Sequence, residues 1–245
     1  MKRRIPLKQR MNVIYEDNAL MVLEKAAGVL SQPVKDDPRE SVVELIRYYW
    51  KSQKARQQYI GIVQRLDMET SGVLVVAKNK VAQRVLQQQF ATHQIGKRYL
   101  AITSNIPNQR KGRLVGSITR DKSGKRVVLQ DSAKGKEAAT RYKVIDEFGN
   151  NALLEVAPET GRTHQIRLQL SRINCAIVGE PLYVSSTKKQ KRATRCMLHA
   201  WKLSFLHPDT CKRVEFESPM PEDMKKYIES MKIEQPANPA NEENA

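Results

Sequence analysis

Hydrophobic residues in this chain fall mostly into short runs bounded by turn residues, a pattern that predicts strands. Two runs, 13–15 and 20–23, flank Glu16-Asp17-Asn18 and predict a hairpin. The apolar run at 73–77 predicts another strand. Further strands are predicted, most of them separated by turn signals, at 98–103, 113–118, 126–130, 137–146, 152–156, 203–205 and 214–216.

Helix signals are fewer and lie between the predicted strands. Ser41-Val42-Val43-Glu44 is a capping box that predicts a helix to about Lys51. Asn79 is predicted to cap a second helix, and Thr163 a third. A last helix is predicted to begin at Pro221, with apolar residues on one face. Strands in succession with interspersed helices indicate an α+β domain, not a regular βαβ alternation.

The net charge of the chain indicates which class of molecule it binds. Lys and Arg number 43 against 26 Asp and Glu, which gives a net charge of +17 and a pI near 9.9. An excess of this size predicts binding to a polyanion, most often nucleic acid. We expect no membrane association, because no run approaches the roughly 18 apolar residues of a membrane span.

Cysteine and histidine are too few and too dispersed to suggest a disulfide framework or a metal site. Cys175, Cys196 and Cys211 are odd in number and have no C-x-x-C spacing. The basic N-terminus has no apolar segment and cleavage site behind it. We therefore expect a reducing, cytoplasmic compartment and no metal.

Three basic clusters are candidates for contact with nucleic acid. They are an N-terminal arm at 1–10, a predicted hairpin at 110–126, and a loop at 188–195. Each cluster taken alone fits a solvated surface equally well. If the clusters do bind RNA, affinity is expected to fall steeply with salt.

Two motifs carry the chemistry. Gln64-Arg65-Leu66-Asp67-Met68-Glu69-Thr70-Ser71-Gly72 sets an acid between an arginine and a Thr-Ser-Gly turn. Gly161-Arg162-Thr163-His164-Gln165-Ile166-Arg167 follows nearly a hundred residues later. Either motif alone fits a structural role, because a lone Asp most often caps a turn and a helix Arg is usually solvated. Together they closely resemble the two signature motifs of the RluA family of RNA pseudouridine synthases.

The resemblance implies a role for each motif residue. Asp67 stands at the position of the nucleophile that attacks a uridine, and Arg167 at that of the arginine paired with it. Tyr99, in Lys97-Arg98-Tyr99-Leu100-Ala101, matches an aromatic that stacks on the flipped uracil. Arg65 corresponds to an arginine that enters the RNA stack or contacts phosphate. The expected substrate-contacting set is Arg65, Thr70, Arg162, His164, Gln165 and Ile166.

The reaction that the resemblance implies needs no cofactor. The C1′–N1 bond of uridine breaks, the uracil turns, and C1′ joins C5, so nothing is oxidised and no group is imported. A carboxylate can act as the nucleophile without a base to deprotonate it. A nearby cation lowers an Asp pKa by about 1–3 units, which is why an Arg partner is expected.

A third segment, Met197 to Pro208, matches the family's L-H-A-x-x-L-x-F-x-H-P strand. The resemblance implies the pseudouridine synthase fold, a long, bent, mostly antiparallel sheet with flanking helices and a central cleft. We expect a basic arm at 1–11, a catalytic domain at 12–233 without an S4 domain, and a disordered tail at 234–245. The protein is expected to act as a monomer.

Some positions depart from the family pattern. The family usually has His where this chain has Gln64, and Gly-Asp where it has Gly179-Glu180. Asn174 replaces a Gly, and Asn tolerates the left-handed conformation. None of these departures removes the nucleophile, its arginine or the tyrosine.

Several alternatives stay open at the level of the sequence. A non-catalytic RNA-binding or ribosome-assembly factor could have kept this fold, and a DNA-binding protein would share the charge. For the enzyme, neither the target RNA, tRNA or large-subunit rRNA, nor the atom attacked, C6 or C1′, follows from the motifs.

Overall fold

The computed structural model describes residues 7–120, 126–129, 135–184 and 193–233. These residues form one eleven-stranded sheet whose main path runs β1-β2-β4-β10-β5-β9-β8-β6-β7, with β3 pairing β4 and β11 pairing β10. The strands are β1 (Met11–Glu16), β2 (Leu20–Lys25), β3 (Gly61–Ile62), β4 (Ser71–Ala77), β5 (Gly96–Thr103), β6 (Lys111–Arg120), β7 (Arg126–Leu129), β8 (Lys136–Phe148), β9 (Asn151–Pro158), β10 (Leu198–Leu206) and β11 (Arg213–Glu217).

The two halves of the sheet meet where β4 pairs with β10. This pairing is parallel and short, joining His199 to Ser71 and Ala200 to Gly72, whereas the other pairings between the named strands are antiparallel. Gly72 has φ +117°, and a Cβ there would lie 2.2 Å from the Ala200 carbonyl oxygen. Only glycine permits this close approach. Asp67 lies four residues before β4, and so near this junction.

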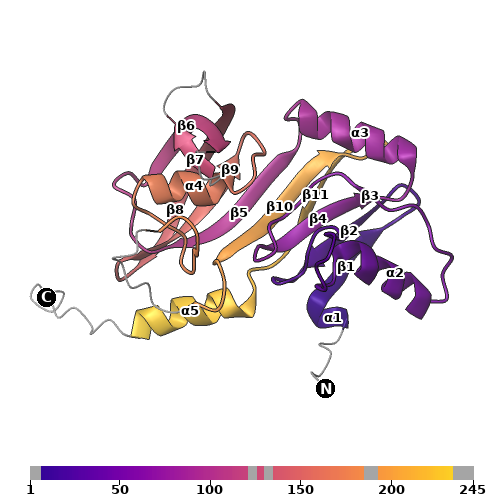
Figure 1. Cartoon of the computed structure of the whole chain (residues 1–245), viewed down its shortest axis with the longest axis horizontal. Coiled ribbons are helices and arrows are strands. Elements are labelled where there is room, and N and C mark those ends of the chain that lie inside the picture. Colours follow the sequence, from indigo (N-terminus) through magenta and orange to yellow (C-terminus); the bar gives the residue numbers. More distant parts are fainter. Residues whose placement is uncertain (1–6, 121–125, 130–134, 185–192, 234–245) are drawn as a thin grey trace, which may run out of the picture.

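The helices flank the sheet at both ends (Figure 1). They are α1 (Leu7–Arg10), α2 (Val42–Ser52), α3 (Lys80–Ala91), α4 (Gln165–Arg172) and α5 (Glu222–Ile233). Figure 1 shows α2 and α3 beside the N-terminal strands, and α4 and α5 beside the half that contains β5, β8 and β9. The predicted capping box at Ser41 and the Asn79 cap are both present. No helix in this part of the chain is long and apolar enough to cross a membrane.

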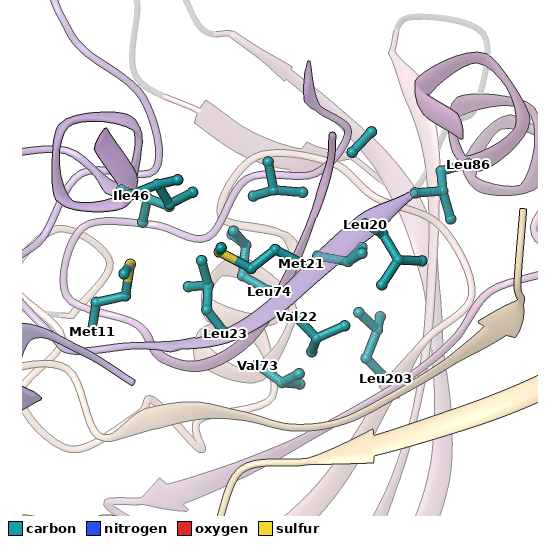
Figure 2. Close-up of a cluster of buried hydrophobic side chains, with 14 of the residues drawn as sticks. Met11, Leu20, Met21, Val22, Leu23, Ile46, Val73, Leu74, Leu86 and Leu203 are labelled. Carbon is teal, nitrogen blue, oxygen red and sulfur yellow. The ribbon is translucent and has the colours of Figure 1, made fainter. Parts of the chain in front are cut away.

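Each half of the sheet has its own hydrophobic core. The N-terminal core packs β2 and β4 against α2 and α3, and Figure 2 shows Leu20, Leu23, Ile46, Leu74 and Leu86 in it. All seven residues of β4 are buried, which explains its uninterrupted apolar sequence. The second core lies among β5, β8, β9 and α4, and Met224 of α5 also packs there. Two cores joined by a short parallel pairing place the cleft between them.

The predicted strands are confirmed in place, although most are longer than the apolar runs that indicated them. β8 extends to Lys136 and Phe148, and β10 begins at Leu198, five residues before its predicted start. The short β3 and α1 were not predicted, because neither has enough residues to show a period. The last helix begins at Glu222, one residue after Pro221. The arm before residue 7 and the tail at 234–245 lie outside the described residues.

Candidate active site

The segment between β3 and β4 brings Asp67 to the junction of the two halves. The Thr70 backbone N–H donates to the Asp67 carbonyl oxygen at 3.0 Å and closes a turn. Thr70 is buried, whereas one-quarter of the Asp67 side chain is exposed. The carboxylate therefore lines the cleft and stays accessible to a substrate.

A buried lysine, Lys25, is hydrogen-bonded to the backbone of this loop. Lys25 Nζ donates to the Met68 carbonyl oxygen at 3.0 Å, and to the carbonyl oxygens of Ala26 and Val29 at 3.0 and 2.8 Å. The Lys25 side chain has no exposed surface, and burial lowers its pKa to about 7 although the charge of Asp67 opposes the shift. Lys25 thus ties the end of β2 to the residue that follows Asp67.

A buried arginine holds the same loop from the side of β10. Arg195 Nη1 donates to the Glu69 carbonyl oxygen at 3.2 Å, and Nε and Nη2 donate to the Asp223 carboxylate at 2.6 and 3.0 Å. The Cys196 N–H donates to Glu69 Oε2 at 3.2 Å. Because two separate elements fix its backbone, the loop holds Asp67 in a defined position.

Arg167, in the first turn of α4, contacts Asp67 and a second carboxylate with different nitrogens. Its Nη1 donates to Asp67 Oδ2 at 3.2 Å, while Nε and Nη2 donate to Glu180 at 2.6 and 2.8 Å. The Tyr183 ring lies 5.5 Å from the guanidinium carbon. The bidentate pair with Glu180 fixes the plane of the guanidinium, and this directs Nη1 toward Asp67.

The electrostatics of the Arg167–Glu180 pair favour the charged forms of both groups. Burial would raise the pKa of Glu180, but the hydrogen bonds and charge of Arg167 outweigh it and lower that pKa. Burial would lower the pKa of Arg167, and its hydrogen bonds to Glu180 instead raise it. A permanent positive charge therefore faces Asp67.

His164 is placed beside Asp67 by an unusual backbone conformation. It has φ 58° and ψ 18°, and it is the N-cap of α4 without a side-chain capping bond. The prediction that Thr163 caps this helix is wrong, since α4 begins at Gln165. The Nε2 atom of His164 lies 3.8 Å from Asp67 Oδ1, and its Nδ1 atom lies 2.7 Å from the Tyr183 hydroxyl.

Tyr99, in β5, also lines the cleft. Its side chain is half-buried, and burial, followed by the charge of Asp67, raises the pKa of its hydroxyl. The phenol therefore stays neutral at physiological pH. Its ring offers an aromatic face to a base that enters the cleft.

The cleft has a volume of about 850 Å³, large enough for a nucleoside. Among the described residues that line it, Asp67 is the only carboxylate, whereas Arg65, Lys97, Arg162 and Arg167 are cations. Burial, together with the nearby charge of Arg162, lowers the pKa of Lys97 to about 8. No group of three His, Cys, Asp or Glu suited to a metal occurs in the described part of the chain. Among its described lining residues, the cleft thus combines a single carboxylate with several cations.

Comparison with known proteins identifies the family to which this chain belongs. A family model described as RNA pseudouridylate synthase matches residues 19–172. The chain is 33% identical over 233 residues to ribosomal large subunit pseudouridine synthase D of Zymomonas mobilis, covering 91% of this chain and 73% of that protein. It is 38% identical over 195 residues to the enzyme of the same name from Borreliella burgdorferi, covering 78% and 60%. The chain belongs to the RluA family of RNA pseudouridine synthases.

The fold agrees with this assignment. The structure of human RNA pseudouridylate synthase domain containing 4 superposes with a TM-score of 0.75 at 24% identity, covering 90% of this chain and 92% of that one. The pseudouridine synthase fold that the motifs implied is therefore confirmed, and the protein is an RNA pseudouridine synthase.

All residues that the motifs singled out line one cleft in this family member: Arg65, Asp67, Thr70, Tyr99, Arg162, His164, Gln165, Ile166 and Arg167. Their surroundings differ, however. Arg65 is exposed, whereas Arg162 is half-buried and its Nε donates to the Glu137 carbonyl oxygen at 2.9 Å. Ile166 is buried in the second core, with only 6% of its surface exposed.

Gln165 has a supporting position in the structure. Its Oε1 accepts from the Thr160 hydroxyl and from the Arg162 N–H, and its Nε2 donates to the Ala139 carbonyl oxygen and the Thr140 hydroxyl. These four bonds use the full capacity of the amide. The Gln165 side chain, which was expected to contact substrate, thus has no free donor or acceptor. Its hydrogen bonds fix the loop before α4.

Sequence reasoning missed the residues that hold Asp67 and Arg167 in place. Glu180 stood out only as a departure from a Gly-Asp pair, and Lys25 and Arg195 carried no local sign of burial. Arg195 was assigned to the basic loop at 188–195, but its side chain is buried and bound to Asp223, so that assignment is wrong for this residue. Asn174 does adopt the expected left-handed conformation, with φ 64°.

The other basic clusters contain many paired cations. Arg10 pairs with Glu40, Arg110 with Glu147, and Arg113 with Glu159. Residues 1–6, 121–125 and 188–192 of the clusters lie outside the described part of the chain.

Proposed function

We propose that this protein isomerises a uridine in large-subunit ribosomal RNA, with Asp67 as the nucleophile. The observation that carries the proposal is the contact between Asp67 Oδ2 and Arg167 Nη1 at 3.2 Å, in a cleft that is otherwise cationic. The names of the relatives, large-subunit pseudouridine synthases, support ribosomal RNA over tRNA.

The geometry supports a division of labour in the cleft. A uridine flipped out of the RNA would stack on Tyr99, with Ile166 on the wall of the same cleft. Asp67 would attack the flipped nucleotide, and Arg167 would hold the carboxylate in position through the 3.2 Å hydrogen bond. The C1′–N1 bond breaks and the C1′–C5 bond forms. C5 loses a proton, N1 gains one, and the bond to Asp67 breaks again, so atoms and electrons balance without a cofactor.

The rival role is an RNA-binding factor without catalysis. The family assignment disfavours it, and so does the number of contacts that serve only to place Asp67 and Arg167. A binding protein would not need two buried cations beneath one loop. We also propose that the enzyme acts as a monomer, and light scattering of the free protein tests this.

Tritium release from RNA labelled at uridine C5 tests the reaction. Large-subunit rRNA and tRNA are assayed separately, with Asp67→Ala and Asp67→Asn as controls. We expect release from rRNA, and none above background from either variant. Release from tRNA alone would overturn the assignment of rRNA as the substrate. No release from either RNA, despite tight binding, would overturn the proposed reaction.

A further inference from the structure

Acidic residues are nearly absent from the middle of the chain. Between Leu45 and Arg120 the only carboxylates are Asp67 and Glu69, against fourteen Lys and Arg. Such a one-sided distribution creates a positive surface wherever these cations are not paired with acids from elsewhere in the fold. The structure shows which of them are paired.

Cations on β5, β6 and β8 are paired with glutamates. Arg98 pairs with Glu155, and Arg113 and Arg141 both pair with Glu159. Within the described part of the chain, no ion pair involves the exposed cations of α2, of the loop after it, or of the first half of α3. We call these six residues the α2–α3 rim: Arg47, Lys51, Lys54, Arg56, Lys80 and Arg84.

The rim is continuous with the wall of the active cleft. The Tyr59 hydroxyl donates to Gln83 Oε1 at 2.6 Å and so joins the loop after α2 to α3. Gln83 Nε2 in turn lies 3.5 Å from the Ile62 carbonyl oxygen. Ile62, like Phe90 at the end of α3, lines the cleft. The segment from the end of α2 to β3, and the helix α3, thus each contribute residues both to the cleft and to the rim.

The rim also carries exposed aromatic rings. Tyr48, on α2, is 58% exposed, and Tyr59, in the loop after α2, is 40% exposed. Aromatic faces between cations suit a nucleic-acid strand, since bases can stack while the phosphates meet positive charge. A face that served only solubility would need neither the aromatic rings nor charge of a single sign.

We propose that the α2–α3 rim binds the phosphate backbone of the RNA that flanks the target uridine. The identity of the nucleic acid rests on the proposed function; the site itself rests on the unpaired charge. The rim would hold the RNA on the N-terminal side of the cleft while the flipped base enters it. The surface is distinct from the three clusters that the sequence suggested.

Salt dependence of binding tests the rim against a matched control. The rim variant is Lys51→Gln/Lys54→Gln/Arg56→Gln, and the control is Arg98→Gln/Arg113→Gln/Arg141→Gln. Both remove three exposed cations, but only the control cations are paired with glutamates. Binding to a transcript of large-subunit rRNA is measured by anisotropy over a range of salt concentrations, and circular dichroism confirms that both proteins are folded.

The rim variant is expected to flatten the plot of log K against log salt by about 2–3, because each lost phosphate contact contributes about 0.7–0.9 to the slope. The control should flatten it by less than 1. Equal changes in the two variants, or an unchanged slope in the rim variant, would overturn the proposal. If the rim variant does not fold, Lys80→Gln/Arg84→Gln on α3 gives the same test, with an expected change of about 1.5.

Tritium release by the unmodified protein, measured on the same transcript, separates this proposal from the proposed function. A flattened slope without release supports the rim and overturns the isomerase activity on that RNA. Release with an unchanged slope in the rim variant overturns the rim and leaves the activity intact.

Discussion

Replacing Glu180 with glutamine should disable Arg167 without touching a group that contacts the substrate. Glu180 accepts hydrogen bonds from Arg167 Nε and Nη2, and its side chain has no exposed surface. A glutamine at this position has one acceptor oxygen, and its amide nitrogen would face the guanidinium, donor against donor. Arg167 would then stay buried and charged, with Asp67 as its nearest remaining anion.

The magnitude follows from the burial of the pair. Removing one partner of a buried ion pair costs about 3–5 kcal/mol, because the other charge is left without compensation. For a chain of this length that loss corresponds to a fall in Tm of roughly 6–20 °C. Turnover should fall as well, since a tilted guanidinium no longer directs Nη1 at Asp67; we expect a loss of about tenfold or more, or about 1.4 kcal/mol.

Two assays check the prediction, with Glu180→Asp as the control that keeps the charge. Thermal unfolding measures the stability and tritium release measures kcat and KM. A positioning role predicts that Glu180→Gln lowers kcat more than it raises KM, and that Glu180→Asp recovers part of both losses. If Glu180→Gln unfolds within 1 °C of the wild type and turns over at the same rate, Glu180 does not hold Arg167.

The pH dependence gives an independent check. The pKa of Glu180 is lowered in the folded state, so its contribution to stability is present above the unfolded value of about 4.3 and is lost as pH falls through the folded value. Glutamine does not titrate. The stability gap between wild type and Glu180→Gln should therefore be full at neutral pH and narrow only below about pH 4.

Three other substitutions test the support of the site. Lys25→Met leaves the Met68 carbonyl without its donor and should lower the free energy of unfolding by about 3 kcal/mol or more. The pKa of Lys25 is lowered to about 7 in the folded protein, so above that pH the unfolded chain binds the proton more readily than the folded one. Urea titrations should therefore show wild type gaining stability over the variant from pH 7 to about 10. Tyr99→Phe should keep most RNA affinity, whereas Tyr99→Leu should raise KM by about tenfold or more in steady-state assays, since base stacking contributes about 1–3 kcal/mol. Gly72→Ala should unfold the protein at far lower temperature, since the new Cβ would lie 2.2 Å from the Ala200 carbonyl oxygen.

The sequence was sufficient to single out candidate residues that the fold brings together in one cleft. Asp67, Tyr99 and Arg167 lie in motifs whose chemistry is specific, and all three line the same cleft. Strand positions could also be predicted, because alternating or apolar runs report which face of a sheet is buried. The helix start at Gln165 could not, because His164 takes a left-handed conformation that residue preferences disfavour outside glycine.

The supporting residues could not be predicted because their role depends on contacts between distant segments. Lys25 ends a strand and reads as a surface lysine, yet its Nζ meets the carbonyl oxygen of Met68, 43 residues away. Arg195 belongs to a basic run in the sequence and is nevertheless buried against Asp223. Burial of a charged residue has no local signature, since the residues that compensate for it come from other elements.

The same argument explains why basic clusters in a sequence are weak evidence for an RNA surface. The sequence counts cations, whereas binding depends on the cations left over after the fold has paired them with acids. Arg113 lies in a dense basic cluster and is bound to Glu159, but Lys54 lies in a sparser segment and has no ion pair in the described structure. Removing Arg113 would leave Glu159 with Arg141 as its remaining partner, while removing Lys54 would remove a positive charge that no acid offsets in the described structure. We therefore expect RNA to bind where acids are missing, and the segment between Leu45 and Arg120 is where they are fewest.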